Sequence, residues 1–222
     1  MSTAIEVVRN ARSRSARLSV DPRNGRIKLT IPARASAAKA LAWAEGQRGW
    51  IEAQRAKLPE PRPFAPGSRI PFGDGEIEIV WSGPQARAPK LEGDRLVCGG
   101  PRIGLERRVE RWLRAAALSL LSEETAEYAA RAGVTVTGVS VGDPRGRWGS
   151  CAASGNIRYS WRLILAPSHV RRATVAHEVA HRVHMNHSPV FHRLVETLYE
   201  ADPTPARDWL RRHGAGLHWV GR

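Results

Sequence analysis

Two histidines four residues apart are the feature of this sequence with the clearest chemistry. His177 and His181 enclose Glu178 in the order His-Glu-Val-Ala-His. On an α-helix, residues four apart lie roughly 40° apart around the axis and about 6 Å apart along it. The two imidazoles therefore converge on one ion, and Zn²⁺ accepts such nitrogens at about 2.0–2.1 Å. Glu178 flanks that ion, where it can take a proton from an activated water and return it to a leaving group.

The third metal ligand decides whether this motif is a metal centre. His184 lies on the same helical face as His177, but a continuous helix would carry it about 10 Å farther along the axis. We therefore expect His184 at the rim of the site. His187 stands six residues after His181, the spacing of an extended zincin motif. Its neighbours are residues that end helices: Asn186, Ser188 and Pro189.

A chain that turns back at this point can aim His187 at the ion, so we favour His187 as the third ligand. Two carboxylates of the following segment, Glu196 and Glu200, are the competing choice. Six of the eight histidines lie between residues 169 and 192, a density that packing alone does not explain. Of these six, we expect His169 and His192 to be simple surface residues. The sequence thus predicts one Zn²⁺ per chain.

The motif needs a buried helix and a sheet to hold it. Val175, Val179 and Val183 form an apolar stripe on the expected metal helix. Before it, residues 156–166 alternate in polarity, which predicts a strand. One row of that strand is apolar: Ile157, Tyr159, Trp161, Leu163 and Leu165. Pro167 ends the strand, and Ser168 is the expected cap of the helix.

The rest of the chain is predicted to mix short strands with two long helices. Strands are expected at 5–9, 16–20, 26–31 and 134–141, and hairpins at 70–72 with 76–81 and within 91–98. Helices are expected from Ser36 to Lys57 and from Pro101 to Ala132, the second ending at Gly133. Trp43 and Trp50 are seven residues apart on the first helix. This spacing favours a place in the core over a platform for stacking bases.

Prolines are dense between residues 59 and 67, which stops a helix and makes a semi-rigid connector. We therefore expect an N-terminal strand–helix region at 1–66 and a catalytic region at 67–222, which may pack as one domain.

Composition excludes several classes of protein. The sequence contains no run of about 18 apolar residues, the length that a membrane span needs. The first residues do not resemble a secretory signal. Two cysteines, Cys98 and Cys151, are too few for a disulfide scaffold or a four-cysteine zinc site. These observations favour a cytoplasmic protein.

The net charge of +14 raises the question of a polyanionic partner. Residues 1–66 hold 13 basic and 5 acidic residues, and residues 141–222 hold 12 and 6, while the middle of the chain is neutral. A solvated sheet face is the simpler reading of the first cluster. DNA or another polyanion is the partner that this charge would allow.

Four segments together resemble the YgjP-like family of zinc metallopeptidases, which is related to the WLM and SprT-like metalloproteases. They are 147–151 (Arg-Trp-Gly-Ser-Cys), 161–163 (Trp-Arg-Leu), 177–181 and 186–191 (Asn-His-Ser-Pro-Val-Phe). The resemblance implies an α+β fold with a zincin-like catalytic core, in which an antiparallel sheet lies beside the metal helix. A small strand-rich region would precede this core. By the same match, the ligands are His177, His181 and His187, and the base is Glu178.

In zincins an edge strand beside the metal helix pairs with an extended substrate, and the resemblance gives this role to a segment of four residues. They are Arg147, Trp148, Gly149 and Ser150. Arg147 could stabilise the oxyanion or serve in a structural ion pair. Tyr159 is a second oxyanion candidate that we expect instead in the core, and Cys151 is expected to be a buried thiol and not a nucleophile.

The leading hypothesis is a zinc-dependent hydrolase that cleaves peptide bonds in a peptide or protein substrate. The alternatives are a nucleic-acid-associated protein with a structural zinc, and a protease that acts on DNA-bound proteins. A closed structural site would need a fourth protein ligand, for which the sequence offers no residue at a clear spacing.

Overall fold

The computed structural model describes residues 4–85 and 87–222 and divides the chain into two compact units. The first unit ends at Glu60 and the second begins at Pro61, within the proline-rich segment. Phe64 is buried in the core of the second unit, and the Arg62 amide donates to the Trp219 carbonyl. Residues 61–66 therefore pack with the second unit and not with the N-terminal region, where the sequence places them.

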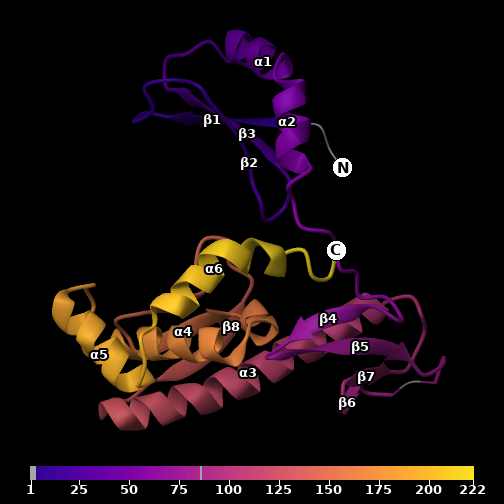
Figure 1. Ribbon diagram of the computed structural model, residues 1–222, viewed down its shortest axis with the longest axis vertical. Coiled ribbons are helices and arrows are strands. Elements are labelled where there is room, and N and C mark those ends of the chain that lie inside the picture. Colours follow the sequence, from indigo (N-terminus) through magenta and orange to yellow (C-terminus); the bar gives the residue numbers. More distant parts are fainter. Residues whose placement is uncertain (1–3, 86) are drawn as a thin grey trace. The chain divides into compact units, whose positions relative to one another are not determined.

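A three-stranded sheet forms the first unit with two helices (Figure 1). Its strands, β1 (Ile5–Asn10), β2 (Arg17–Val20) and β3 (Ile27–Pro32), confirm the three predicted ones. The central strand β3 pairs parallel with β1 and antiparallel with β2. Alternation along β3 buries Ile27, Leu29 and Ile31 on one face, and Ala44 of the helical segment packs with the last two.

The predicted helix from Ser36 to Lys57 is interrupted. It forms α1 (Ala37–Glu45) and α2 (Arg48–Arg55), which are separated at Gly46. The break removes the common helical register on which the seven-residue spacing of the tryptophans depended. Trp43 is 46% exposed and Trp50 is 41% exposed, so the prediction that they belong to the core is wrong.

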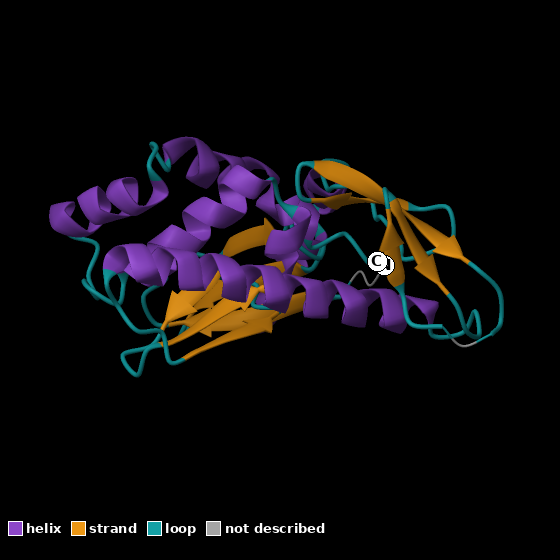
Figure 2. Cartoon of the chain, turned by 90° about the horizontal axis from the view of Figure 1, so that it is seen from below, coloured by secondary structure: helices purple, strands orange, loops and turns teal. Residues whose placement is uncertain are grey.

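The second unit begins with a four-stranded sheet followed by a long helix. The strands are β4 (Arg69–Phe72), β5 (Gly75–Trp81), β6 (Lys90–Glu92) and β7 (Arg95–Cys98), in the order β4-β5-β7-β6. Both predicted hairpins are present. Helix α3 (Leu105–Ala132) is the longest helix and runs past the strands of this unit (Figure 2). It begins four residues later than Pro101, after Gly104, and ends at Gly133 as predicted.

A second sheet of this unit lies beside the metal-motif helix. It consists of β8 (Gly138–Gly142), β9 (Gly149–Cys151) and β10 (Asn156–Ser160), in the order β8-β10-β9. Strand β9 is antiparallel to β10, but β8 is parallel to it, so the expected antiparallel sheet is in fact mixed. The reason is that the chain leaves β8 on one side of β10 and enters β9 on the other.

The strand predicted at 156–166 stops at Ser160 and continues as a short 3₁₀ helix, η1 (Trp161–Leu165). The Ser160 hydroxyl accepts a hydrogen bond from the Arg162 amide, which turns the backbone out of the strand. Alternation fails here because every residue of η1 is buried, Arg162 included.

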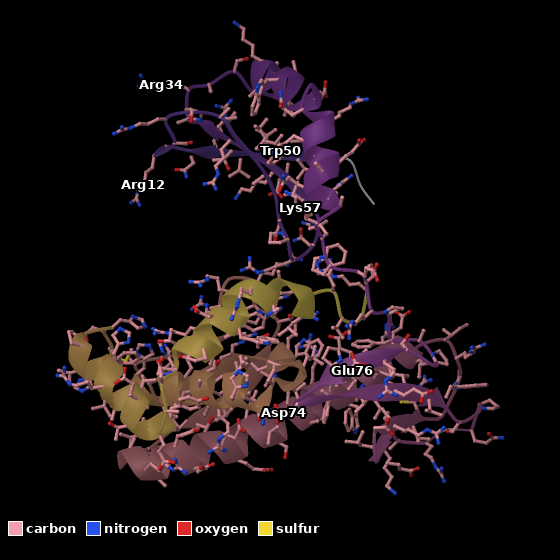
Figure 3. All side chains as sticks on the ribbon, in the orientation of Figure 1. Arg12, Arg34, Trp50, Lys57, Asp74 and Glu76 are labelled. Atoms are coloured by element: carbon pink, nitrogen blue, oxygen red, sulfur yellow. The ribbon has the colours of Figure 1, made fainter. Side chains whose placement is uncertain are left out.

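Three helices complete the second unit: α4 (Ser168–Ala180), α5 (Pro189–Tyr199) and α6 (Thr204–Leu217). Helix α4 packs against α3, α5, α6 and β9. Ser168 is the first helical residue and not the cap. Instead, the Asp74 carboxylate, labelled in Figure 3, accepts a hydrogen bond of 2.9 Å from the Ser168 amide.

The architecture is thus a mixed α+β fold. Within the described part of the chain, none of the helices has the length and apolar character needed to cross a bilayer.

Candidate metal centre

Three imidazoles converge at the C-terminal end of α4. One ring nitrogen from each of His177, His181 and His187 lies within 4.8 Å of the others. The Nε2 atoms of His177 and His187 are 3.3 Å apart, and the ring centroids of His181 and His187 are 4.8 Å apart. The 3.3 Å between the two Nε2 atoms is the separation that two metal–nitrogen bonds of about 2 Å give at a tetrahedral angle. The residues present therefore fit a zinc ion.

The turn after α4 explains why the third histidine reaches this cluster. The helix ends at Ala180, and His181 closes it while still in a helical conformation. His181 Nδ1 lies 3.0 Å from the His184 carbonyl oxygen, so a proton on Nδ1 is donated there and Nε2 stays free for a metal. Ser188 then caps α5, with Pro189 in its first turn. His187 is held between the two helices.

The other candidates for the third position lie outside the cluster. His184 contributes its backbone carbonyl and not its ring. Glu200 forms an ion pair of 3.2 Å with Arg131. Neither its carboxylate nor that of Glu196 lies with the ring nitrogens of His177, His181 and His187. Of the alternatives weighed from the sequence, only His187 is brought to the motif histidines.

Phe191 supports all three imidazoles, a role that no pattern in the sequence predicts. Its ring is fully buried, with centroids 4.9 Å from His177, 4.5 Å from His181 and 5.0 Å from His187. It is stacked on His181 and meets the other two edge to face, both favourable arrangements. The sequence pointed to Phe191 only through its place in segment 186–191, four residues after His187.

Burial keeps the motif histidines neutral at neutral pH. It lowers the pKa of His177 to about 4, with a smaller contribution from the neighbouring histidines. Burial also lowers the pKa of His181. Neutral imidazole is the form that binds a metal, so the environment favours ligation before any ion arrives.

Glu178 is buried beside this cluster, with 6% of its surface exposed. Burial raises the pKa of its carboxyl to about 7, and the positive charge of Arg147 opposes that rise. Gly149 of β9 faces the carboxylate so closely that a Cβ there would lie 2.5 Å from Glu178 Cγ. The strand can therefore approach Glu178 only because residue 149 has no side chain.

The four residues of the predicted substrate segment are distributed along and beside β9. Arg147 is exposed, and its charge acts on Glu178 without a direct hydrogen bond between them. Trp148 packs with the core and fits against Gly214 of α6. Gly149 and Ser150 lie in β9, which is the edge strand of its sheet.

Glu178 lines two cavities, which also share Arg147, Gly149 and His177. A groove of about 290 Å³ runs over the imidazoles and is lined by β9 residues and Met185. A second cavity of about 270 Å³ lies among β9, α4, α5 and α6, and its walls include Val195, Ala206 and Leu210. His192 lines this second cavity and is half-buried, so it is not the simple surface residue expected from the sequence.

Tyr159 takes the core position expected of it, whereas Cys151 is not the buried thiol that the sequence predicted. Tyr159 is fully buried, its hydroxyl is 3.0 Å from Thr125 Oγ1, and burial strongly raises its pKa. Cys151 is half-buried in the groove, and burial raises the pKa of its thiol, which makes it a poor nucleophile.

An α+β unit with a histidine cluster, a buried glutamate and an adjoining edge strand defines a candidate hydrolytic metal centre. The model of one protein family, described as the YgjP-like metallopeptidase domain, matches residues 14–213 of the chain. The chain therefore belongs to the YgjP-like metallopeptidase family, and this membership supports a protease activity. Comparison with curated proteins and with solved structures gives no significant match.

Proposed function

We propose that the protein is a zinc-dependent peptidase with a zincin-like catalytic core. One observation carries the proposal: the imidazoles of His177, His181 and His187 converge next to the buried carboxyl of Glu178. In this proposal the three histidines hold one zinc ion. When bound, zinc supplies Lewis-acid activation of water and of the substrate carbonyl.

Glu178 and Arg147 perform the remaining steps of the reaction in this proposal. Glu178 takes the proton of the attacking water on a carboxylate oxygen and gives it to the departing amine. A carboxyl whose pKa is raised to about 7 is suited to both transfers near neutral pH. Arg147, exposed at the mouth of both cavities, supplies positive charge for the developing oxyanion.

Strand β9 orients the substrate in this proposal. Its outer edge has no strand partner among the described residues, so its backbone can pair with an extended polypeptide. The cavity lined by Val195, Ala206 and Leu210 lies beyond Glu178 and can receive a side chain next to the cleaved bond.

A purely structural zinc is supported less well. Structural zinc sites are closed by four protein ligands. Among the described residues, the cluster at this site contains three potential ligands, and His187 is exposed to the groove. An open fourth position facing a groove is the arrangement that catalysis needs.

Metal analysis of purified wild type, His187→Ala and the matched control His184→Ala tests the ligand set. We expect stoichiometric zinc in the wild type and in His184→Ala, because residue 184 contributes only its carbonyl. His187→Ala should lose most of its zinc. Full zinc in His187→Ala would remove His187 from the ligand set.

Glu178→Gln tests the mechanism, with a broad screen of casein and denatured protein substrates as the assay. We expect the variant to keep its zinc while the rate falls by about 10²–10⁴-fold, the usual contribution of a general base. Unchanged hydrolysis in Glu178→Gln would show that another group moves the proton.

A second proposal concerns a polyanionic partner, with DNA-bound proteins as substrates. The first unit holds 12 basic and 5 acidic residues. Arg12 and Arg34 are exposed and point away from the ribbon (Figure 3), and Trp43 and Trp50 are exposed as well. Exposed cations and aromatic rings are what single-stranded nucleic acids bind.

DNA-stimulated cleavage that weakens with rising salt would support this second proposal. Cleavage of free peptides that responds neither to DNA nor to salt would contradict it.

A further inference from the structure

Exposed apolar residues are concentrated in the sequence next to the third histidine, His187. Seven large apolar residues are exposed in the described part of the chain, and three of them lie within residues 183–190. Val183 is 44% exposed, Met185 is 56% exposed and Val190 is 47% exposed. The other four are distributed over three helices and one loop. We call residues 183–190 the ligand turn, because His187 lies within it.

The ligand turn is held in place by its own hydrogen bonds. The amides of Val183 and His184 both donate to the Ala180 carbonyl, and the His184 carbonyl faces His181 Nδ1. Helix α4 ends before Val183, which removes this residue from the buried stripe of Val175 and Val179. The apolar side chains are thus displayed on an ordered segment, where they are open to contact with a binding partner.

Met185 connects the ligand turn to the groove over the imidazoles. It lines that groove together with Ser150 and Cys151 of β9. A polypeptide that pairs with the free edge of β9 would alternate its side chains between the two faces of the sheet. One row of side chains would then face the histidine cluster and Met185. The groove offers this row no acidic partner besides the buried Glu178.

We propose that the ligand turn recognises an apolar side chain of an extended polypeptide, so that the enzyme selects apolar segments of unfolded proteins. The inference rests on the proposed peptidase function and adds the class of substrate. The occupant follows from continuity: Met185 belongs both to the ligand turn and to the groove in which the cleaved chain would lie.

Binding is measured by fluorescence anisotropy on zinc-loaded Glu178→Gln protein, which should not cleave the probe. Two labelled eleven-residue peptides serve as probes, one with leucines at alternate positions and one with serines in their place. The test variants are Met185→Ser and Val190→Ser. The matched controls are Ile103→Ser and Leu118→Ser, which change exposed apolar residues elsewhere in the same unit.

We expect the leucine peptide to bind at least about tenfold more tightly than the serine peptide, as burial of a few methylene groups would give. Met185→Ser should reduce that preference by about five- to tenfold, Val190→Ser should reduce it less, and both controls should leave it unchanged. In the active background, Met185→Ser should raise KM for the leucine peptide and leave kcat and zinc content as they are.

Equal binding of the leucine peptide by Met185→Ser and by the controls would overturn the inference. So would a wild-type dimer that Met185→Ser converts to a monomer without a change in peptide binding, because a second copy would then be the occupant. Neither result touches the proposed function, which fails separately if the wild type binds no zinc or cleaves no substrate.

Discussion

Phe191 shows how a single apolar residue can govern a metal site. It contacts each of the three imidazoles and has no polar group of its own, so its effect must come through packing. A ring that fits between ligands fixes their orientation before the metal binds, which lowers the entropy lost on binding.

We therefore predict that Phe191→Leu weakens zinc binding by about tenfold, the lower end of the effect of groups that orient ligands. Competition with a zinc chelator measures this change. Phe64→Leu is the control, because Phe64 is also buried in the same core but does not contact the three imidazoles. If both variants lose stability while both keep wild-type zinc affinity, Phe191 is only a core residue.

Gly149 has a similar influence on the position of Glu178, the proposed general base. Because a Cβ at this position would overlap the Glu178 side chain, Gly149→Ala must displace either the carboxyl or strand β9. We expect kcat/KM to fall by about 10–100-fold, since a small misplacement of a catalytic group costs that much. Zinc content should not change.

Gly146→Ala is the matched control, because a Cβ there meets nothing within 4 Å. Steady-state kinetics on the same substrate compare the two variants. Equal activity of both alanine variants would mean that the close approach of β9 to Glu178 has no part in the reaction.

At the scale of elements, Arg162 joins three segments that lie far apart in the sequence. Its guanidinium donates to the Leu217 and Val220 carbonyls at 2.6 and 2.9 Å, and it forms an ion pair of 2.8 Å with Asp143. Asp143 directly follows β8, and the segment from there to β9 carries Arg147. The η1 helix therefore ties the C-terminal residues to the loop that borders the site.

This ion pair predicts a loss of stability in acid. Burial acts to raise the pKa of Asp143, but the hydrogen bonds and charge of Arg162 outweigh it and leave that pKa below the ordinary 3.8. A carboxyl with a lowered folded pKa stabilises the fold above its unfolded pKa and loses that contribution as pH falls through the folded value. The contribution is thus intact at pH 5 and declines below about pH 4.

Asp143→Asn should cost about 2 kcal/mol in the free energy of unfolding at pH 7, a value reduced because Asp143 is partly exposed. The difference between wild type and variant should shrink as pH falls below about 4. Urea unfolding from pH 7 to pH 3 measures it. A difference that stays constant across this range would mean that the carboxylate charge is not what Arg162 uses.

The elements that sequence could predict are those set by local patterns. The β4–β5 and β6–β7 hairpins follow from turn residues, and the end of α3 follows from Gly133. The η1 helix could not be predicted from local patterns. It buries Arg162, whose guanidinium donates a hydrogen bond to the Leu217 carbonyl, 55 residues away in the chain. Periodicity assigned its side chain to an exposed face, and tertiary hydrogen bonds decided otherwise.

Among the site residues, too, those set by local spacing could be predicted and those set by tertiary packing could not. Residues 177–181 have a fixed spacing within one helix, so geometry alone predicted their convergence. His187 was one of several candidates for the third ligand, because its position depends on the turn after α4. A contact between His181 Nδ1 and the His184 carbonyl oxygen holds this turn. Phe191 and His192 gave weak signals, since packing against ligands and lining a cavity leave no pattern in one sequence.

At the scale of the whole molecule, the two units have separate cores, and the candidate metal site lies in the second unit. The first core contains Leu29, Ile31 and Ala44, and the second contains Phe191 and the helices of the site. All of the proposed catalytic and ligand residues belong to residues 61–222, whereas the family match begins at residue 14 and so includes most of the first unit. The first unit thus contributes something other than metal ligands.

We predict that residues 61–222 alone fold, bind one zinc ion and cleave short peptides with a kcat/KM within about threefold of the full chain, because no proposed site residue is removed. They should lose most of the affinity for single-stranded DNA that we propose for the full chain, since the unit left out has 12 basic and 5 acidic residues and exposes Trp43 and Trp50. Zinc analysis, chelator-dependent thermal unfolding and DNA titration from 50 to 200 mM salt measure these properties. Undiminished DNA affinity in residues 61–222 would assign polyanion binding to the basic residues of the second unit. A shortened chain that folds without binding zinc would show that the first unit helps to build the metal centre.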